Sequence, residues 1–232
     1  MKIEVLADAE SVAHRAAALI AAATRAALAA RGRFSVAVSG GQTPWAMLRL
    51  LAHEEVPWEG VHVFQVDERV APAGHPDRNL THLRESLLQH ASLRPEQIHA
   101  MPVESLDLEV AATQYVLALR EIAGTPPVLD LAHLGLGPDG HTASLVPGDP
   151  VLDVTDEDVA LTRVYQGRRR MTLTYPILNR ARRILWLVTG GEKAGMLARL
   201  RTGDGSIPAG RIRRDQALVL ADQAAASQPG PT

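Results

Sequence analysis

The sequence contains no cysteine among its 232 residues. This absence excludes disulfide bridges, thiolate nucleophiles and cysteine ligands for a metal, so histidines, carboxylates and basic side chains remain to carry any chemistry. Long apolar runs are lacking as well. No stretch approaches the ~18 uninterrupted apolar residues that a membrane-spanning helix needs, so the sequence predicts a protein outside the transmembrane class that does not act on a membrane.

An excess of charge of either sign is also missing. The chain carries 24 basic and 26 acidic residues, for a formal net charge of −2, and the two signs are interspersed. Because composition gives no basic face for a nucleic-acid backbone, we expect no nucleic-acid partner. The first ten residues, MKIEVLADAE, are acidic and lack the apolar run and cleavage pattern of a secretory signal, which favours a cytoplasmic location.

What is present is an ordinary globular composition. Hydrophobic residues make up 46% of the chain and charged residues 22%, values typical of a folded protein. The length lies within the range of one α/β domain. We therefore expect a single catalytic domain over residues 1–224 and a loose C-terminal tail over residues 225–232.

Helix-type and strand-type patterns alternate along the chain. An alanine-rich segment predicts a helix from Asp8, its N-cap, to about Arg31, and Thr43 and Pro44 are predicted to be the N-cap and first residue of the next helix. Strands are predicted at 34–39, 61–66, 129–136, 184–189 and 217–220, and further helices at 45–52, about 80–88, 108–122 and 192–200. This alternation predicts an α/β fold, in which helices cover both faces of a mainly parallel sheet.

Ligands of such sheets bind outside the carboxyl ends of the strands, and four loops there form one candidate site. The first loop, Ser39–Pro44, reads SGGQTP. Gly40 and Gly41 allow the backbone close to a ligand, and the free N–H groups of the following helix attract an anion, so this loop is a candidate phosphate cradle. A plain strand-to-helix turn is the alternative, because neither the Walker pattern nor GxGxxG is present.

The second loop contains Asp67, Glu68 and Arg69 directly after a predicted strand. A carboxylate here can bind sugar hydroxyls, and a guanidinium can bind a charged group. Such triplets are also common as solvated charges that pair with one another, so the alternative is a surface loop without a ligand.

The third loop, residues 135–142, reads GLGPDGHT and carries the most information. His141 is the one histidine of nine that follows an apolar strand in a glycine-flanked loop, and Asp139 lies two residues before it, where it can orient the ring. This arrangement suits a general base. The alternative is a turn in which Asp139 binds the local backbone and His141 caps the next helix. By contrast, His133 within the strand is predicted to be a core or edge histidine.

The fourth region combines Arg168–Arg170 with Lys193, which follows a glycine pair. An arginine run is usually a solvated surface. A lysine in the first turn of a helix opposes the helix dipole, so a ligand explains Lys193 better than helix stability does.

Five segments, taken together and in order, resemble the 6-phosphogluconolactonase family, to which the glucosamine-6-phosphate deaminases are related. They read SGGQTP, VDERVAP with HPDRNL, LGLGPDGHTASLVPG, RMTLTYPILNRA and LVTGGEKAGML, and span residues 39–197. The resemblance implies a Rossmann-like, glucosamine-6-phosphate deaminase-like fold. It also implies hydrolysis of 6-phospho-D-glucono-1,5-lactone to 6-phospho-D-gluconate in the oxidative pentose phosphate pathway, without a cofactor, by a monomer or small homo-oligomer.

The resemblance also implies roles for individual residues. His141 activates water and Asp139 orients its ring, while Asp67 and Arg69 contact or organise the sugar end. Backbone N–H groups of residues 137–141 are candidates for stabilising the oxyanion. The phosphate-binding residues are Gly41, Gln42, Thr43, Arg170 and Lys193, with Gly40 in the same loop.

Two other functions compete with lactone hydrolysis. In a deaminase-isomerase of amino-sugar phosphates, Asp67 would abstract a carbon-bound proton. Deaminases typically read GHIAFNEPG, with an acid after the histidine, whereas residues 142–147 here read TASLVP, which favours the lactonase. A sugar-phosphate-binding regulator without activity is the second rival, and the presence of His141 and Asp139 argues against it.

No His-Glu-x-x-His helix and no GxGxxG fingerprint occur in the sequence, so we predict hydrolysis without a metal ion or nicotinamide cofactor. Lactone hydrolysis by the purified protein should keep its full rate after exhaustive chelation with EDTA and without added nucleotide. Loss of activity that one divalent ion restores would contradict the prediction and would make His141 a metal ligand.

Overall fold

The computed structural model describes residues 1–227 and contains a central sheet of seven strands in which every neighbouring pair is parallel. Strands β2 (Phe34–Val38) and β9 (Ile184–Val188) are buried along their whole length, as expected where both faces of a parallel sheet are covered. The prediction of a mainly parallel α/β sheet is confirmed. From one edge to the other the strands are β1 (Lys2–Leu6), β10 (Ala217–Asp222), β9 (Ile184–Val188), β6 (Leu131–Gly135), β2 (Phe34–Val38), β3 (Val61–Gln65) and β5 (Ile98–His99).

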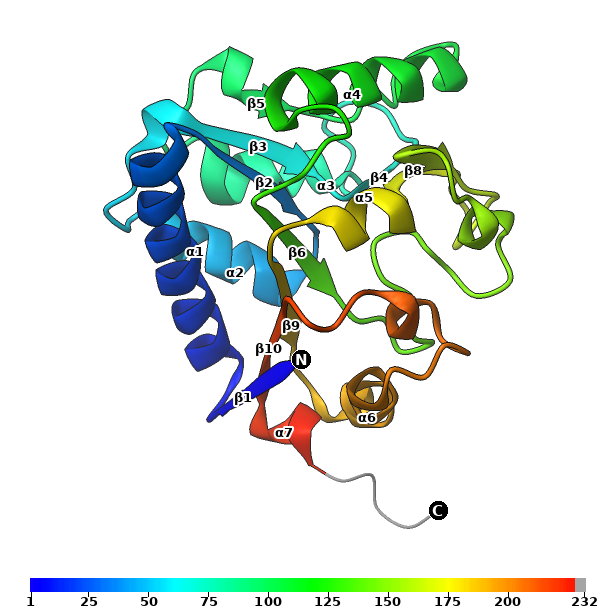
Figure 1. Ribbon diagram of the computed structural model, residues 1–232. Coiled ribbons are helices and arrows are strands. Elements are labelled where there is room, and N and C mark those ends of the chain that lie inside the picture. The colour runs from blue at the N-terminus through cyan, green and yellow to red at the C-terminus, as the bar shows by residue number, and fades with distance from the viewer. Residues whose placement is uncertain (228–232) are drawn as a thin grey trace.

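Helices cover both faces of this sheet (Figure 1). Val36 and Val38 of β2 belong to an apolar cluster with α1 (Ala9–Arg31) and α2 (Gln42–Leu51). Ala37, which points the other way, belongs to a second cluster with α4 (Leu108–Ala123), α5 (Tyr175–Arg180) and α6 (Ala194–Thr202). In residues 1–227 no helix has the length and apolarity needed to cross a membrane. The helices are α1 (Ala9–Arg31), α2 (Gln42–Leu51), α3 (Asn79–Leu83, continued by a π-helical turn at Arg84–Leu88), α4 (Leu108–Ala123), α5 (Tyr175–Arg180), α6 (Ala194–Thr202) and α7 (Gln223–Ala226).

The start of α1 agrees with the sequence, and the start of α2 does not. Asp8 caps α1 and accepts a hydrogen bond from the N–H of Ser11 at 2.8 Å, as predicted. The N-cap of α2 is Gly41, at φ 128°, so the predicted Thr43 cap is wrong. The Thr43 hydroxyl instead forms a 2.7 Å hydrogen bond with that of Thr189, which follows β9. This contact joins the first turn of α2 to the loop after β9 at the carboxyl edge of the sheet.

A second, antiparallel sheet of three strands was not predicted. Its order is β4 (Asp67–Arg69), β8 (Arg170–Leu173) and β7 (Val159–Leu161), so the triplet expected in a loop forms a strand. Strands β4 and β8 lie far apart in the sequence, so no local pattern indicates that they pair. β1 was also missed, because it is a short edge strand with partly exposed side chains.

The expected loose tail over residues 225–232 falls mostly outside the described residues. Asp222 caps α7 by accepting from the N–H of Ala225 at 2.7 Å, and Ala225 is buried. The first two residues of the expected tail therefore belong to a helix that packs on the domain.

His133 of β6 is fully buried, which confirms the prediction of a core histidine. Its Nδ1 accepts a hydrogen bond from the N–H of Ser39 at 3.2 Å, and Nε2 has no hydrogen-bond partner among the described residues. Burial lowers the pKa of His133 to about 4. A neutral imidazole in the core thus holds the first residue of the glycine loop against the central strand.

We predict that His133 makes the protein less stable in mild acid. The pKa of His133 in the folded protein lies below the ordinary value of ~6.5, so the unfolded chain binds the proton first as the pH falls. The free energy of unfolding therefore decreases as the pH falls from ~6.5 towards 4, by on the order of 3 kcal/mol. His133→Asn keeps an acceptor for Ser39 and removes this loss. Urea unfolding at several pH values should show a flatter dependence for His133→Asn than for the wild type or for the exposed-site control His53→Asn. Equal slopes would refute the assignment.

Candidate active site

A cavity of about 190 Å³ lies where β2 and β6 end, beside the small sheet. The loops that follow β2, β6 and β9 meet there, as the strand directions require, and strands β4 and β8 of the small sheet complete the lining. The predicted residues that line it are Gly40, Asp67, Arg69, His141, Arg170 and Lys193. Gly41, Gln42 and Thr43 do not line this cavity, and Asp139 lies behind His141.

His141 and Asp139 form the closest polar contact of the site. Nδ1 of His141 lies 2.5 Å from Oδ1 of Asp139, which also accepts from the backbone N–H of His141 at 3.1 Å. No hydrogen bond within residues 1–227 engages Nε2, the ring nitrogen left for a substrate or water. No helix follows within residues 141–148, so the alternative in which His141 caps a helix is wrong.

Glycine is essential to the shape of this loop. A Cβ on Gly137 would lie 2.1 Å from Nδ1 of His141, and Gly140 has φ 83°. The N–H of Gly137 donates to the carbonyl of His141 at 2.8 Å, and the N–H of Gly140 donates to the carbonyl of Gly137 at 3.0 Å. With the N–H of His141 bound to Asp139, these three donors are used within the loop. The N–H of Asp139 is the backbone donor of residues 137–141 that has no partner among the described residues, so it stays the candidate for the expected oxyanion site.

Asp139 is held on both carboxylate oxygens. Oδ1 faces His141, and the hydroxyl of Tyr165 donates to Oδ2 at 2.9 Å. Burial raises the pKa of the Asp139 carboxyl, but the neighbouring His141 and the hydrogen bonds from His141 and Tyr165 lower it by more, so the net pKa lies below the usual value. Asp139 is therefore an ionised partner that can stabilise an imidazolium.

Arg170, at the start of β8, is a buried cation without a full set of partners. It is 4% exposed, and its Nε has no hydrogen-bond partner among the described residues. Burial lowers the pKa of Arg170, and the positive charge of Arg69 lowers it further. Two guanidinium groups that face one cavity, together with the ammonium of Lys193, suit a bound phosphate dianion.

Asp67 is 4% exposed and held by two side chains that had no predicted role. The Ser144 hydroxyl donates to its Oδ2 at 2.7 Å, and the Asn79 amide donates to its carbonyl at 3.0 Å and to Oδ1 at 3.3 Å. Asn79 also accepts from Nη1 of Arg69 at 2.7 Å. Asn79 lies in the segment HPDRNL and Ser144 in the segment GHTAS. These two segments were the sequence signal from which a role for both residues could have been predicted.

A fully buried carboxylate, Glu68, fixes the strand that presents Asp67 and Arg69. It accepts from the backbone N–H groups of Asn79 and Leu80 at 2.8 Å each, which ties β4 to the start of α3. Side chains alternate along a strand, so Glu68 points inward while its two neighbours face the cavity. The buried carboxylate therefore positions both cavity-lining residues.

Lys193 reaches the cavity from the loop after β9. The N–H of Gly190, at φ 97°, donates to both carboxylate oxygens of Asp222, at 3.0 and 3.1 Å. Gly191–Lys193 then form a 3-10 turn, and α6 begins only at Ala194, so the helix predicted from residue 192 begins two residues later. Within residues 1–227 no group of three or more histidine, aspartate or glutamate side chains is placed to bind a metal ion.

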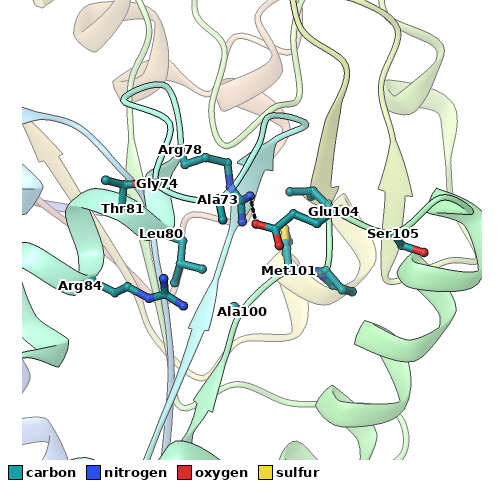
Figure 2. Close-up of a pocket in the computed structure, with 12 residues that line it drawn as sticks. Ala73, Gly74, Arg78, Leu80, Thr81, Arg84, Ala100, Met101, Glu104 and Ser105 are labelled. Atoms are coloured by element: carbon teal, nitrogen blue, oxygen red, sulfur yellow. Dashed lines mark hydrogen bonds and ion pairs between the residues drawn. The ribbon is translucent and has the colours of Figure 1, made fainter.

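A larger hollow of about 340 Å³ lies beside the start of α3 (Figure 2). Its wall contains Arg78 and Glu104, whose side chains form an ion pair at 2.8 Å, drawn as a dashed line. Arg78 also lies 3.2 Å from the Glu68 carboxylate behind the small sheet. No predicted site residue lines this hollow. The volume of a cavity therefore does not identify the site in this protein, because the histidine and the basic side chains line the smaller cavity.

Comparisons with known proteins give one family. The family model of glucosamine-6-phosphate isomerases/6-phosphogluconolactonase matches residues 7–220. A 6-phosphogluconolactonase from Synechocystis sp. is 37% identical over 203 residues, which cover 86% of this chain and 84% of that protein. The 6-phosphogluconolactonase of Mycobacterium tuberculosis is 36% identical over 240 residues, which cover 97% of each chain.

Solved structures give the same fold. The crystal structure of 6-phosphogluconolactonase from Thermotoga maritima has a TM-score of 0.85 at 29% identity and covers 95% of this chain and 98% of its own. A monomeric glucosamine-6-phosphate deaminase also has a TM-score of 0.85, covering 99% of this chain and all of its own, but at 19% identity it shows the fold alone. The chain belongs to the glucosamine-6-phosphate isomerase/6-phosphogluconolactonase family.

Proposed function

We propose that this chain is a 6-phosphogluconolactonase, which hydrolyses 6-phospho-D-glucono-1,5-lactone to 6-phospho-D-gluconate in the oxidative pentose phosphate pathway. One observation carries the proposal: a histidine paired with an ionised aspartate lines the same small cavity as Arg69, Arg170 and Lys193. A base and three cations in one cavity match a substrate with a hydrolysable carbonyl and a phosphate. The curated relatives named above carry the same activity in their names.

His141 acts as the general base. A lactone is an activated ester, so its hydrolysis needs a deprotonated water and a fixed substrate but no covalent intermediate. Nε2 takes a proton from the water as its oxygen attacks the lactone carbonyl, and the imidazolium then returns the proton to the ring oxygen as the ring opens. Asp139 orients the imidazole and stabilises its charged form, as the aspartate of a catalytic triad does.

The cations and the glycine loop hold the phosphate. Arg170 and Lys193 supply charged hydrogen bonds, and Gly40, which also lines the cavity, adds the backbone of the glycine loop. Gln42 and Thr43 lie outside the cavity lining and contribute only the positive end of the α2 dipole next to Gly40. Asp67 and Arg69 organise the sugar end. We place the activity in the cytoplasm, in a monomer or small homo-oligomer that needs no cofactor and binds no nucleic acid.

Deamination of an amino-sugar phosphate is the weaker candidate. It would require Asp67 to act as a base, but both oxygens of its carboxylate already accept hydrogen bonds, from Ser144 and Asn79. Residues 142–147 carry no acid to complete a deaminase triad. These two features favour the lactonase.

We predict that His141→Ala lowers kcat by ~10²-fold or more while the protein stays folded, the usual effect of losing a general base. The measurement is hydrolysis of freshly prepared lactone, corrected for spontaneous opening. His53→Ala, at an exposed position outside the cavity, is the matched control and should keep wild-type activity. Near-normal turnover by folded His141→Ala would remove this residue from the mechanism.

We further predict that Lys193→Ala and Arg170→Ala each reduce the preference for the phosphorylated lactone over glucono-1,5-lactone. A lost charged hydrogen bond to a bound dianion costs roughly 1.5–3 kcal/mol, which the ratio of the two kcat/KM values reports. Arg201→Ala, at an exposed position of α6, removes a positive charge outside the cavity and should leave the ratio unchanged. If both cavity variants keep the full preference, the phosphate binds elsewhere.

A further inference from the structure

A tyrosine from outside the predicted site completes the His141–Asp139 pair. Tyr165 donates its hydroxyl to Oδ2 of Asp139 at 2.9 Å, while Oδ1 of the same carboxylate faces Nδ1 of His141 at 2.5 Å. The carboxylate is therefore held from two sides, by a phenol and by an imidazole. Rotation of Asp139 would break both hydrogen bonds.

The hairpin that joins β7 to β8 fixes the position of Tyr165. The N–H of Tyr165 donates to the carbonyl of Arg168 at 2.9 Å, and the N–H of Arg168 donates to the carbonyl of Tyr165 at 3.3 Å. Gln166 and Gly167, between them, have φ values of 50° and 79°, as two-residue hairpin turns with left-handed central residues require. A tight turn therefore carries the ring to the edge of the cavity.

The Tyr165 ring also contacts the cation that we assign to the phosphate. Its centroid lies 5.7 Å from that of the His141 ring, at 66°, and 4.9 Å from Cζ of Arg170. Gln166, the next residue, accepts from Nη2 of Arg170 at 3.2 Å. The ring lies in contact with both the base and the buried guanidinium.

We propose that Tyr165 is a positioning residue for lactone hydrolysis. Its hydroxyl holds Asp139 so that Nε2 of His141 faces the attacking water, and its ring links the base to Arg170. This inference rests on the proposed role of His141 as the general base. It predicts that Tyr165 affects kcat more than KM, because it supports the base and does not itself bind the substrate.

The phenol remains a donor throughout the working pH range. Burial raises the pKa of Tyr165, and its hydrogen bond to Asp139 raises it further. By donating, the phenol takes up part of the negative charge that Asp139 would otherwise direct at the imidazolium. The charged and titratable groups around His141, including those across the cavity, are Asp67, Arg69, Asp139, Tyr165, Arg170 and Lys193.

Tyr165→Phe tests the hydroxyl alone, because the ring remains. We expect kcat to fall about tenfold, comparable to the loss of one hydrogen bond to a charged group, with little change in KM. The acid limb of the kcat/KM profile should move to higher pH, because Asp139 without its donor stabilises the imidazolium more strongly. The same shift should appear in the pH titration of the His141 ring signals by ¹⁵N NMR without substrate.

Two further variants separate positioning from folding. Tyr165→Leu also removes the ring, and it should lose more of the preference for the phosphorylated lactone than Tyr165→Phe does. Val164→Ala, at a neighbouring position that is 68% exposed, is the control and should match the wild type. The NMR titration needs no turnover, so it tests Tyr165 even if the wild type fails to hydrolyse the lactone, a result that would contradict only the proposed function. A Tyr165→Phe titration that coincides with that of the wild type would overturn the inference.

Discussion

The common direction of the central strands is the constraint on which the site depends. Because β2, β6 and β9 are parallel neighbours, their carboxyl ends lie at one edge, and the loops that follow them must meet there. The glycine loop, the His141 loop and the Lys193 loop come from three different thirds of the sequence, yet they surround one cavity. The small antiparallel sheet lies at this edge and contributes Asp67, Arg69 and Arg170.

Buried charge is the second organising feature, and each buried group is tied to the backbone or to a partner. Glu68 accepts from the first N–H groups of α3, and Asp67 accepts from Ser144. A buried carboxylate without such donors would be strongly destabilising. Three arginines are less complete, because Nε of Arg69, of Arg78 and of Arg170 lacks a hydrogen-bond partner among the described residues. Arg78 has the Glu68 carboxylate 3.2 Å from its Nε, whereas Arg69 and Arg170 line the cavity. We interpret the shortfall at Arg170 as the place of the substrate phosphate.

The local sequence was sufficient to predict the central elements. Regular apolar spacing and end signals, such as Asp8 at the start of α1, predicted most of the large sheet and its helices. His141 was recognisable because it is the one histidine of nine in a glycine-flanked loop after an apolar strand, with Asp139 two residues before it. A contact between Asp139 and the His141 ring was therefore expected, and it is observed.

What the sequence did not reveal depends on contacts between distant segments. The pairing of β4 with β8 joins residues about a hundred positions apart, so Asp67–Arg69 looked like a loop. Thr43 appeared to be an N-cap, but its hydroxyl binds Thr189 across the sheet edge. Tyr165 lies in a polar hairpin without a motif of its own, and only the fold brings its hydroxyl to Asp139.

Lactone hydrolysis and deamination by this protein are distinguished by assaying both substrates side by side. The wild-type protein is given freshly prepared 6-phosphoglucono-1,5-lactone and, in parallel, glucosamine-6-phosphate, with lactone consumption measured against the spontaneous rate and ammonia release measured in the second reaction. We expect lactone hydrolysis far above the spontaneous rate, with no ammonia. Ammonia release, or lactone loss at the spontaneous rate, would contradict it.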